Sequence, residues 1–191
     1  MSKGRLEAFS DGVIAIIITI MVLELRVPHG ADPEALAPLG PVFLCYALSF
    51  IFLGIYWNNH HHLFQAVKRV TGGVLWPNLH LLFWLSLIPF VTGWMGENHF
   101  APFPVALYGV VLLFSGAGYT ILVRSLITAH SDNAGLAEAI GDDFKGKISL
   151  VCYAAAIPLA FANVWISVGL YVLVAILWLI PDRRIEPILK S

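Results

Sequence analysis

The chain has 191 residues, of which 59% are hydrophobic and only 12% are charged, whereas soluble proteins carry about 25% charged residues. Its formal net charge is −1, and it has no stripe of Lys and Arg with interleaved aromatic residues, which excludes a basic nucleic-acid-binding protein. The mean hydropathy of +0.81 predicts an all-α integral membrane protein embedded in a lipid bilayer, because spans of about 20 apolar residues each would take up most of the chain.

Six apolar segments follow one another, and we expect each to cross the membrane as a helix. They cover residues 6–26, 38–64, 73–95, 103–128, 145–162 and 164–181. The turn between the last two is expected at Asn163, and helix kinks are expected at Pro89 and Pro158. We therefore predict a single six-helix domain over residues 1–191.

The distribution of basic residues predicts the orientation. With the N-terminus inside, ten of the eleven Lys and Arg residues fall on the inner side: Lys3, Arg5, Lys68, Arg69, Arg124, Lys145, Lys147, Arg183, Arg184 and Lys190. Only Arg26 falls outside, and an excess of positive charge marks the cytoplasmic side. Both termini are therefore expected in the cytoplasm. Acidic residues on the outer side, Glu24 among them, are expected to attract cations to the outer mouth.

The first segment contains the polar triplet Phe9-Ser10-Asp11 close to its start. A carboxylate inside a membrane helix costs about 3 kcal/mol or more and needs a partner. At 100° per residue, Ser10 and Asp11 both point away from Ile16. We therefore expect the triplet to face the helix bundle.

Partners for Asp11 are expected at the same depth, near the end of the second segment and the start of the third. These places carry Trp57, the histidine run 60–62 and Asn78, whose indole, imidazole and amide groups can donate hydrogen bonds to a carboxylate. A metal or haem site is the alternative. However, adjacent histidines on a helix point about 100° apart and cannot easily bind one ion.

Another face of the first segment carries Ile16, Thr19, Ile20 and Leu23 at the i, i+3, i+4, i+7 spacing. Periodicity alone favours ordinary helix packing for this face. The alternative is a pore lining in a symmetric oligomer, where rings of Ile and Leu form a hydrophobic constriction that gates by dewetting. Thr19 would then supply a ring of hydroxyl groups.

The sequence predicts neither an enzyme nor a cofactor. No Ser/His/Asp or Cys/His set has a supporting context for nucleophilic catalysis. A transporter with alternating access and a histidine-liganded membrane redox protein remain alternatives to a channel.

The spacing Arg5-x-x-x-Phe9-Ser10-Asp11 resembles the Arg-x-x-x-Phe-Ser-Asp signature of the transmembrane protein 175 family of potassium channels. The resemblance extends over the first three segments, through Trp57, His60-His61, Leu63-Phe64, Asn78 and residues 86–90. Bacterial and archaeal members of that family have one six-helix repeat. The resemblance therefore implies a multi-pass protein of a prokaryotic cell membrane.

The resemblance also implies a homotetramer whose first helix lines a central pore for K⁺ and other monovalent cations, with weak selectivity. The constriction then falls on Ile16, followed by Thr19, with Ile20 and Leu23 as outer layers. A network bracing the first helix would join its motif residues to the second and third helices; its members are Arg5, Phe9, Ser10, Asp11, Trp57, Asn78 and either His60 or His61.

Overall fold

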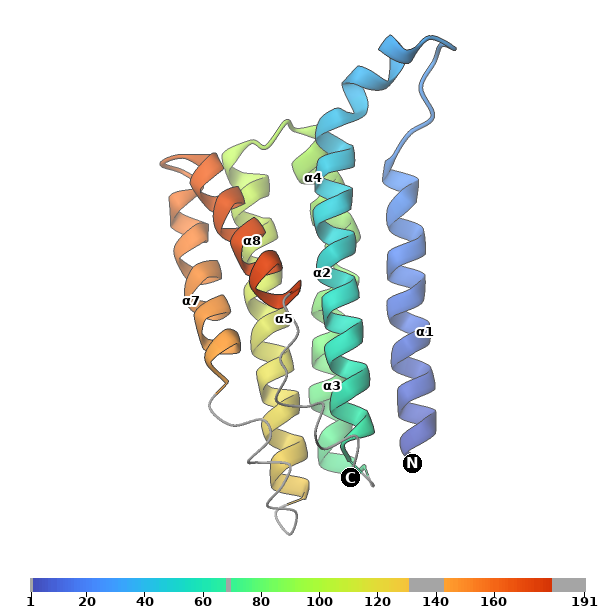
Figure 1. The fold of residues 1–191 in the computed structure, drawn as a ribbon, viewed down its shortest axis with the longest axis vertical. Helices are drawn as coiled ribbons and strands as arrows, with labels where there is room; N and C mark the ends of the chain where they lie inside the picture. The colour runs from blue at the N-terminus through green and yellow to red at the C-terminus, as the bar shows by residue number, and fades with distance from the viewer. Residues whose placement is uncertain (1, 68–69, 131–142, 180–191) are drawn as a thin grey trace.

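The computed structural model describes residues 2–67, 70–130 and 143–179, and the ordered elements in these ranges are helical (Figure 1). In chain order they are α1 (Lys3–Met21), the 3₁₀ helices η1 (Val22–Glu24) and η2 (Pro33–Leu39), α2 (Gly40–Gln65), α3 (Gly72–Ser86), α4 (Ile88–Glu97), α5 (Pro102–Ala129), α7 (Phe144–Leu159) and α8 (Val164–Leu179).

Four helical stretches are long and apolar enough to cross a membrane: Lys3–Glu24, Pro33–Gln65, Gly72–Glu97 and Pro102–Ala129. Helices α7 and α8 have 16 residues each and correspond to the last two expected segments. The turn between them is at Asn163, as expected, and the Asn163 side-chain oxygen accepts a hydrogen bond of 3.0 Å from the backbone N–H of Trp165. The protein is therefore an all-helical membrane protein.

The third expected segment, 73–95, is not one helix, because Leu87 separates α3 from α4. Pro89 lies in the first turn of α4, where its missing N–H costs nothing since N–H groups there have no intrahelical acceptor. Pro158 is the last residue but one of α7, so it marks the end of that helix rather than a kink within it.

Helix α1 lies at one edge of the bundle and packs against α2, α3 and α4, while α7 and α8 lie at the opposite edge (Figure 1). Its buried side chains form one stripe, which consists of Leu6, Ser10, Ile14, Ile17 and Met21. The α-helical geometry ends at Met21, whereas we expected the helix to reach residue 26. Leu23 is therefore in the 3₁₀ turn η1, outside the α-helical face to which the sequence assigned it.

The described basic residues divide between the two ends of the bundle. Those on the predicted inner side lie toward the end where α1 begins (Figure 1): Lys3, Arg5, Arg124, Lys145 and Lys147. Arg26 follows η1 at the other end. The remaining five residues used to predict the orientation, which are Lys68, Arg69, Arg183, Arg184 and Lys190, lie outside the described residues.

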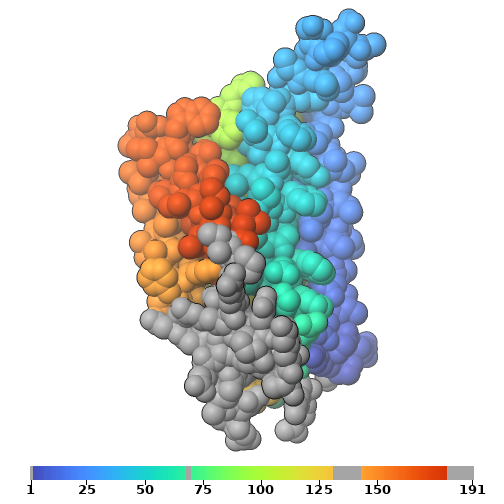
Figure 2. Space-filling view, viewed as in Figure 1, coloured from blue at the N-terminus to red at the C-terminus, as the bar shows by residue number. Residues whose placement is uncertain are grey.

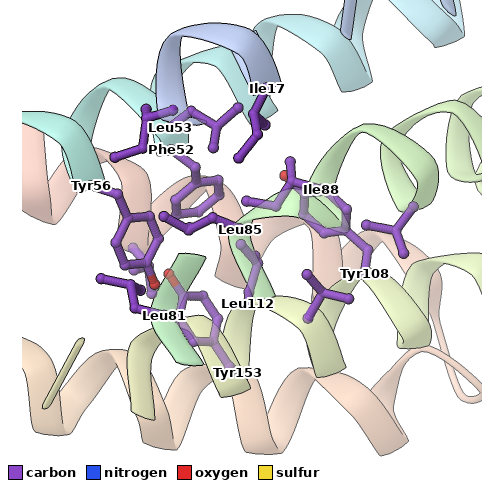
Figure 3. Close-up of a cluster of buried hydrophobic side chains, with 14 of the residues drawn as sticks. Ile17, Phe52, Leu53, Tyr56, Leu81, Leu85, Ile88, Tyr108, Leu112 and Tyr153 are labelled. Atoms are coloured by element: carbon purple, nitrogen blue, oxygen red, sulfur yellow. The ribbon is translucent and has the colours of Figure 1, made fainter. Parts of the chain in front are cut away.

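One hydrophobic core contains buried side chains from α1, α2, α3, α4, α5, α7 and α8. Figure 3 shows part of this core, with Ile17, Phe52, Leu53, Tyr56, Leu81, Leu85, Ile88, Tyr108, Leu112 and Tyr153. Helices approach closely where a glycine leaves room. A Cβ atom on Gly96 would lie 2.7 Å from the Cα atom of Val42, and one on Gly109 would meet the hydroxyl of Tyr171. The α2–α4 and α5–α8 contacts therefore require these glycines.

Candidate functional site

A buried polar chain connects α1, α3 and α2 near the start of α1. The side-chain amide of Asn78 donates a hydrogen bond of 2.9 Å to the Ser10 hydroxyl, and its carbonyl oxygen lies 2.8 Å from Nε2 of His60. Because an amide oxygen only accepts, Nε2 of His60 must donate. The three residues are at most 1% exposed, and the His60 ring also stacks on Phe64 with centroids 4.5 Å apart. Ser10 thus ties α1 to the other two helices.

Asp11 takes part in a second, more exposed contact. Nε1 of Trp57 donates a hydrogen bond of 3.1 Å to its carboxylate. The Trp57 indole is 43% exposed and stacks on His61, whose Nε2 lies 2.8 Å from the side-chain amide of Gln65. The polar layer predicted around Asp11 is therefore two separate groups, and it is Asn78 rather than Asp11 that bonds a histidine.

The three consecutive histidines have three different environments. His60 bonds Asn78 and His61 stacks on Trp57, whereas Nδ1 of His62 is buried with no hydrogen-bond partner among the described residues. Within residues 2–67, 70–130 and 143–179, no three His, Cys, Asp or Glu side chains are grouped so that they could hold a metal ion. The run therefore provides single contacts between helices.

Two residues of the expected bracing network lie elsewhere. Phe9 is 48% exposed. Seven residues along a helix amount to almost two full turns, so Phe9 lies on the face of Ile16, and the expectation that it faces the bundle with Ser10 is wrong. Arg5 is also exposed, and it makes no ion pair with any described residue of the chain. The ion pair at the start of α1 instead joins Lys3 to Glu7, with 3.7 Å between nitrogen and oxygen.

The face of α1 opposite its buried stripe is apolar and exposed. Ile16 is 59% and Ile20 45% exposed, and Leu23, in the 3₁₀ turn η1 that follows α1, is 74% exposed. Figure 2 shows α1 as a narrow strip along the edge of the molecule. The Thr19 hydroxyl, on the same side, donates a hydrogen bond of 2.9 Å to the Ile16 carbonyl and so keeps its oxygen lone pairs available to accept.

At the far end of α1, acidic side chains contact their own subunit. The Glu24 carboxylate lies over Gly93 of α4, so that a Cβ atom on this glycine would overlap it. Arg26 pairs with Glu97 at the end of α4, with 2.7 Å between nitrogen and oxygen. The pairing of Glu97 leaves the outer end less negative than the sequence suggested.

A third polar cluster was not anticipated. The Ser49 hydroxyl lies 2.6 Å from that of Thr92 and 2.9 Å from that of Tyr108, and all three side chains are fully buried. The cluster joins α2, α4 and α5. Its three members come from apolar segments that each contain several hydroxyl residues, so the sequence does not show which of them pair.

The two hydrogen-bonded groups near the start of α1, Ser10 with Asn78 and His60, and Asp11 with Trp57, together form a polar anchor for this helix. The fold and this polar anchor define a helical membrane protein whose first helix is held by one face and exposed on the other. The family model for the endosomal/lysosomal potassium channel TMEM175 matches residues 5–89, which include most of α1, all of α2 and α3, and the start of α4. This range contains both hydrogen-bonded groups at the base of α1.

Relatives match over the whole length of the chain. A potassium channel of Chryseobacterium sp. (strain P1-3) is 58% identical over 191 residues, which is 100% of both chains. The crystal structure of a lysosomal potassium-selective channel TMEM175 homolog from Chamaesiphon minutus has a TM-score of 0.77 and 32% identity, over 93% of this chain and 96% of that chain. This chain belongs to the TMEM175 family, which confirms the resemblance read from the sequence.

A vertebrate relative is named as a proton channel rather than a potassium channel. The endosomal/lysosomal proton channel TMEM175 of Gallus gallus is 42% identical over 83 residues, covering 37% of this chain and 17% of that protein. The family is one of ion channels, so the chain is not an enzyme.

Proposed function

We propose that this chain is the subunit of a potassium-permeable channel in the cell membrane of a prokaryote, and that the exposed face of α1 lines the pore. The observation that carries this proposal is that α1 is apolar on both sides, with one stripe buried in its own bundle and the other exposed. An apolar face outside the core must be covered by lipid or by other copies of the chain. The names of the bacterial relatives, which are potassium channels, favour a shared ion path along this face.

The proposed assembly is a homotetramer of six-helix subunits, each formed by one domain over residues 1–191 with both termini in the cytoplasm. A closed cyclic assembly repeats every residue around its axis. The position of α1 at the edge of the subunit supports this arrangement, because its exposed face is open to contact with other copies of the chain (Figure 1). Each residue of the exposed face then forms a ring.

The proposed constriction is the ring of Ile16, with Ile20 and Leu23 as wider outer layers. Rings of aliphatic side chains can exclude water from a narrow pore, and K⁺ passes only when the ring is wide enough to be wetted. The Thr19 ring offers hydroxyl oxygens beside this barrier. Because the Thr19 ring replaces only a few of the oxygens that hydrate an ion, we propose that the channel is weakly selective for K⁺ over Na⁺. We also propose that it needs no cofactor.

The proposed role of the polar anchor is to fix the position of α1. Ser10 is about 9 Å along the helix from Ile16, so its bond to Asn78 and the Trp57–Asp11 bond both act close to the constriction. A tilt of α1 would have to break these bonds. Phe9 and Arg5 then belong to the cytoplasmic mouth of the exposed face.

Glu24 is proposed to attract cations at the outer mouth. Its side chain is half-buried against α4, and it has no basic partner among the described residues, in contrast to Glu97. Its negative charge therefore remains uncompensated close to the outer end of α1.

The function is tested by reconstituting the purified chain into planar bilayers and liposomes without added cofactor. We expect discrete single-channel steps carried by K⁺, with Na⁺ and Cs⁺ fluxes within about tenfold of that for K⁺, which corresponds to a difference of about 1.4 kcal/mol. Slow flux that saturates and depends steeply on temperature would instead show a transporter. Absence of K⁺ flux from folded protein would refute the proposal.

A further inference from the structure

A second feature of the subunit lies away from α1. A partly open cavity of about 30 Å³ lies between α2, α5, α7 and α8. Apolar parts of Phe52, Ile55, Gly116 and Trp178 form much of its wall. No residue of the polar anchor or of the exposed α1 face lines it, so it has no part in the proposed pore.

Two buried tyrosines, Tyr56 and Tyr153, line this cavity, and neither hydroxyl has a hydrogen-bond partner in the part of the chain that the structure describes. Tyr56 is 8% and Tyr153 is 2% exposed. In Figure 3 their two hydroxyl oxygens point toward each other.

The neighbouring buried tyrosines differ in this respect. Tyr108 bonds Ser49 at 2.9 Å, and the Tyr171 hydroxyl donates to the Val105 carbonyl at 3.0 Å. Buried hydroxyl groups in proteins are nearly always hydrogen-bonded. The two hydroxyls that face the cavity have no such partner among the described residues, so water in the cavity can supply one.

We propose that this cavity is a water-binding site, in which one or two water molecules bridge the hydroxyls of Tyr56 and Tyr153. About 10–15 Å³ of such space holds one water molecule, provided that at least two polar groups are within reach. The cavity meets both conditions. It is too small for a lipid chain, and because none of the described residues that line it is charged, it does not suit a bare ion.

A hydrogen bond between α8 and α7 forms part of the cavity wall. Nε1 of Trp178 donates to the Ser149 hydroxyl at 2.9 Å, and both residues line the cavity. The Lys145 ammonium lies 5.9 Å from the centre of the Trp178 ring. Trp178 and Ser149 thus hold α8 and α7 together along one wall of the cavity.

The site is tested by solid-state NMR of the channel in lipid bilayers, with ¹³C at the tyrosine Cζ carbons and signals assigned by Tyr→Phe variants. Magnetisation transferred from water should reach Tyr56 and Tyr153 quickly. Tyr108 and Tyr171 are the internal controls, since both are fully buried and bonded to protein groups. Transfer to Tyr56 and Tyr153 that is as slow as transfer to the controls would overturn the proposal.

A glycine variant provides a second, independent measurement. A Cβ atom on Gly116 would lie 3.7 Å from the Tyr56 hydroxyl oxygen and 3.1 Å from Cδ2 of Leu150, so Gly116→Ala reduces the cavity. We expect this variant to lose the rapid transfer to Tyr56. Gly169→Ala is the matched control on α8, because a Cβ atom there meets nothing within 4 Å. Rapid transfer that survives in Gly116→Ala would contradict a water site.

Discussion

Replacing Asn78 by alanine should destabilise the subunit more than any other change in the polar anchor. Asn78 makes two side-chain hydrogen bonds, of 2.9 Å to Ser10 and 2.8 Å to His60, and all three residues are buried. In membrane proteins one such bond contributes about 0.6 kcal/mol on average and up to about 1.7 kcal/mol. Leaving a buried donor or acceptor without a partner costs about 1–3 kcal/mol.

The expected loss of unfolding free energy for Asn78→Ala is therefore about 2–4 kcal/mol, measured by denaturant titration in detergent micelles. Asn98→Ala is the matched control, because Asn98 is exposed and bonds only the Trp94 carbonyl of its own helix. A double-mutant cycle with Ser10→Ala adds a sharper criterion, because each single change removes the same bond. The two effects should not add, with a coupling of at least about 0.5 kcal/mol.

Two results would refute this reasoning. The first is an Asn78→Ala protein no less stable than Asn98→Ala. The second is strict additivity of the Ser10 and Asn78 effects, which would mean that the two side chains act independently.

Three further changes test other contacts. Trp57→Phe keeps an aromatic side chain but removes the hydrogen bond to Asp11. Since the pair is partly exposed, the loss of unfolding free energy should be about 0.5–1.5 kcal/mol. A loss as large as that of Asn78→Ala would contradict this expectation. Gly109→Ala should cost about 1–3 kcal/mol because it overlaps the Tyr171 hydroxyl, and Tyr171→Phe should recover part of that loss; no recovery would exclude this overlap as the cause. Thr19→Val preserves side-chain shape but removes the hydroxyl, so single-channel K⁺ conductance should fall while stability is unchanged; unaltered conductance would remove Thr19 from the ion path.

Much of the architecture follows from the sequence because membrane helices need long apolar runs. The turn at Asn163 was predicted correctly, as was the burial of Ser10. Phe9 was assigned wrongly because three consecutive residues span about 200° of a helix and cannot all face one bundle. Angular spacing within a helix is available from sequence, so this error was avoidable.

Other features depend on how separate helices are rotated and placed. The angle between His60 and His61 is known from sequence, but which of them meets Asn78 depends on the rotation of α2. Glu24 reaches α4 only because η1 follows α1 as a 3₁₀ turn. The cluster of Ser49 with Thr92 requires the close approach of α2 and α4, which a single sequence does not show.

The central claim, that the exposed face of α1 lines the pore, is tested most directly by Ile16→Asn in single-channel recordings. Ile176→Asn is the matched control, since Ile176 is 52% exposed on α8 and the same amide is introduced away from α1. We expect Ile16→Asn to raise K⁺ conductance or leak severalfold by wetting the constriction, and Ile176→Asn to leave the currents as in the unmodified protein. Equal currents from the two variants, with both proteins folded, would contradict the assignment of Ile16 to the pore.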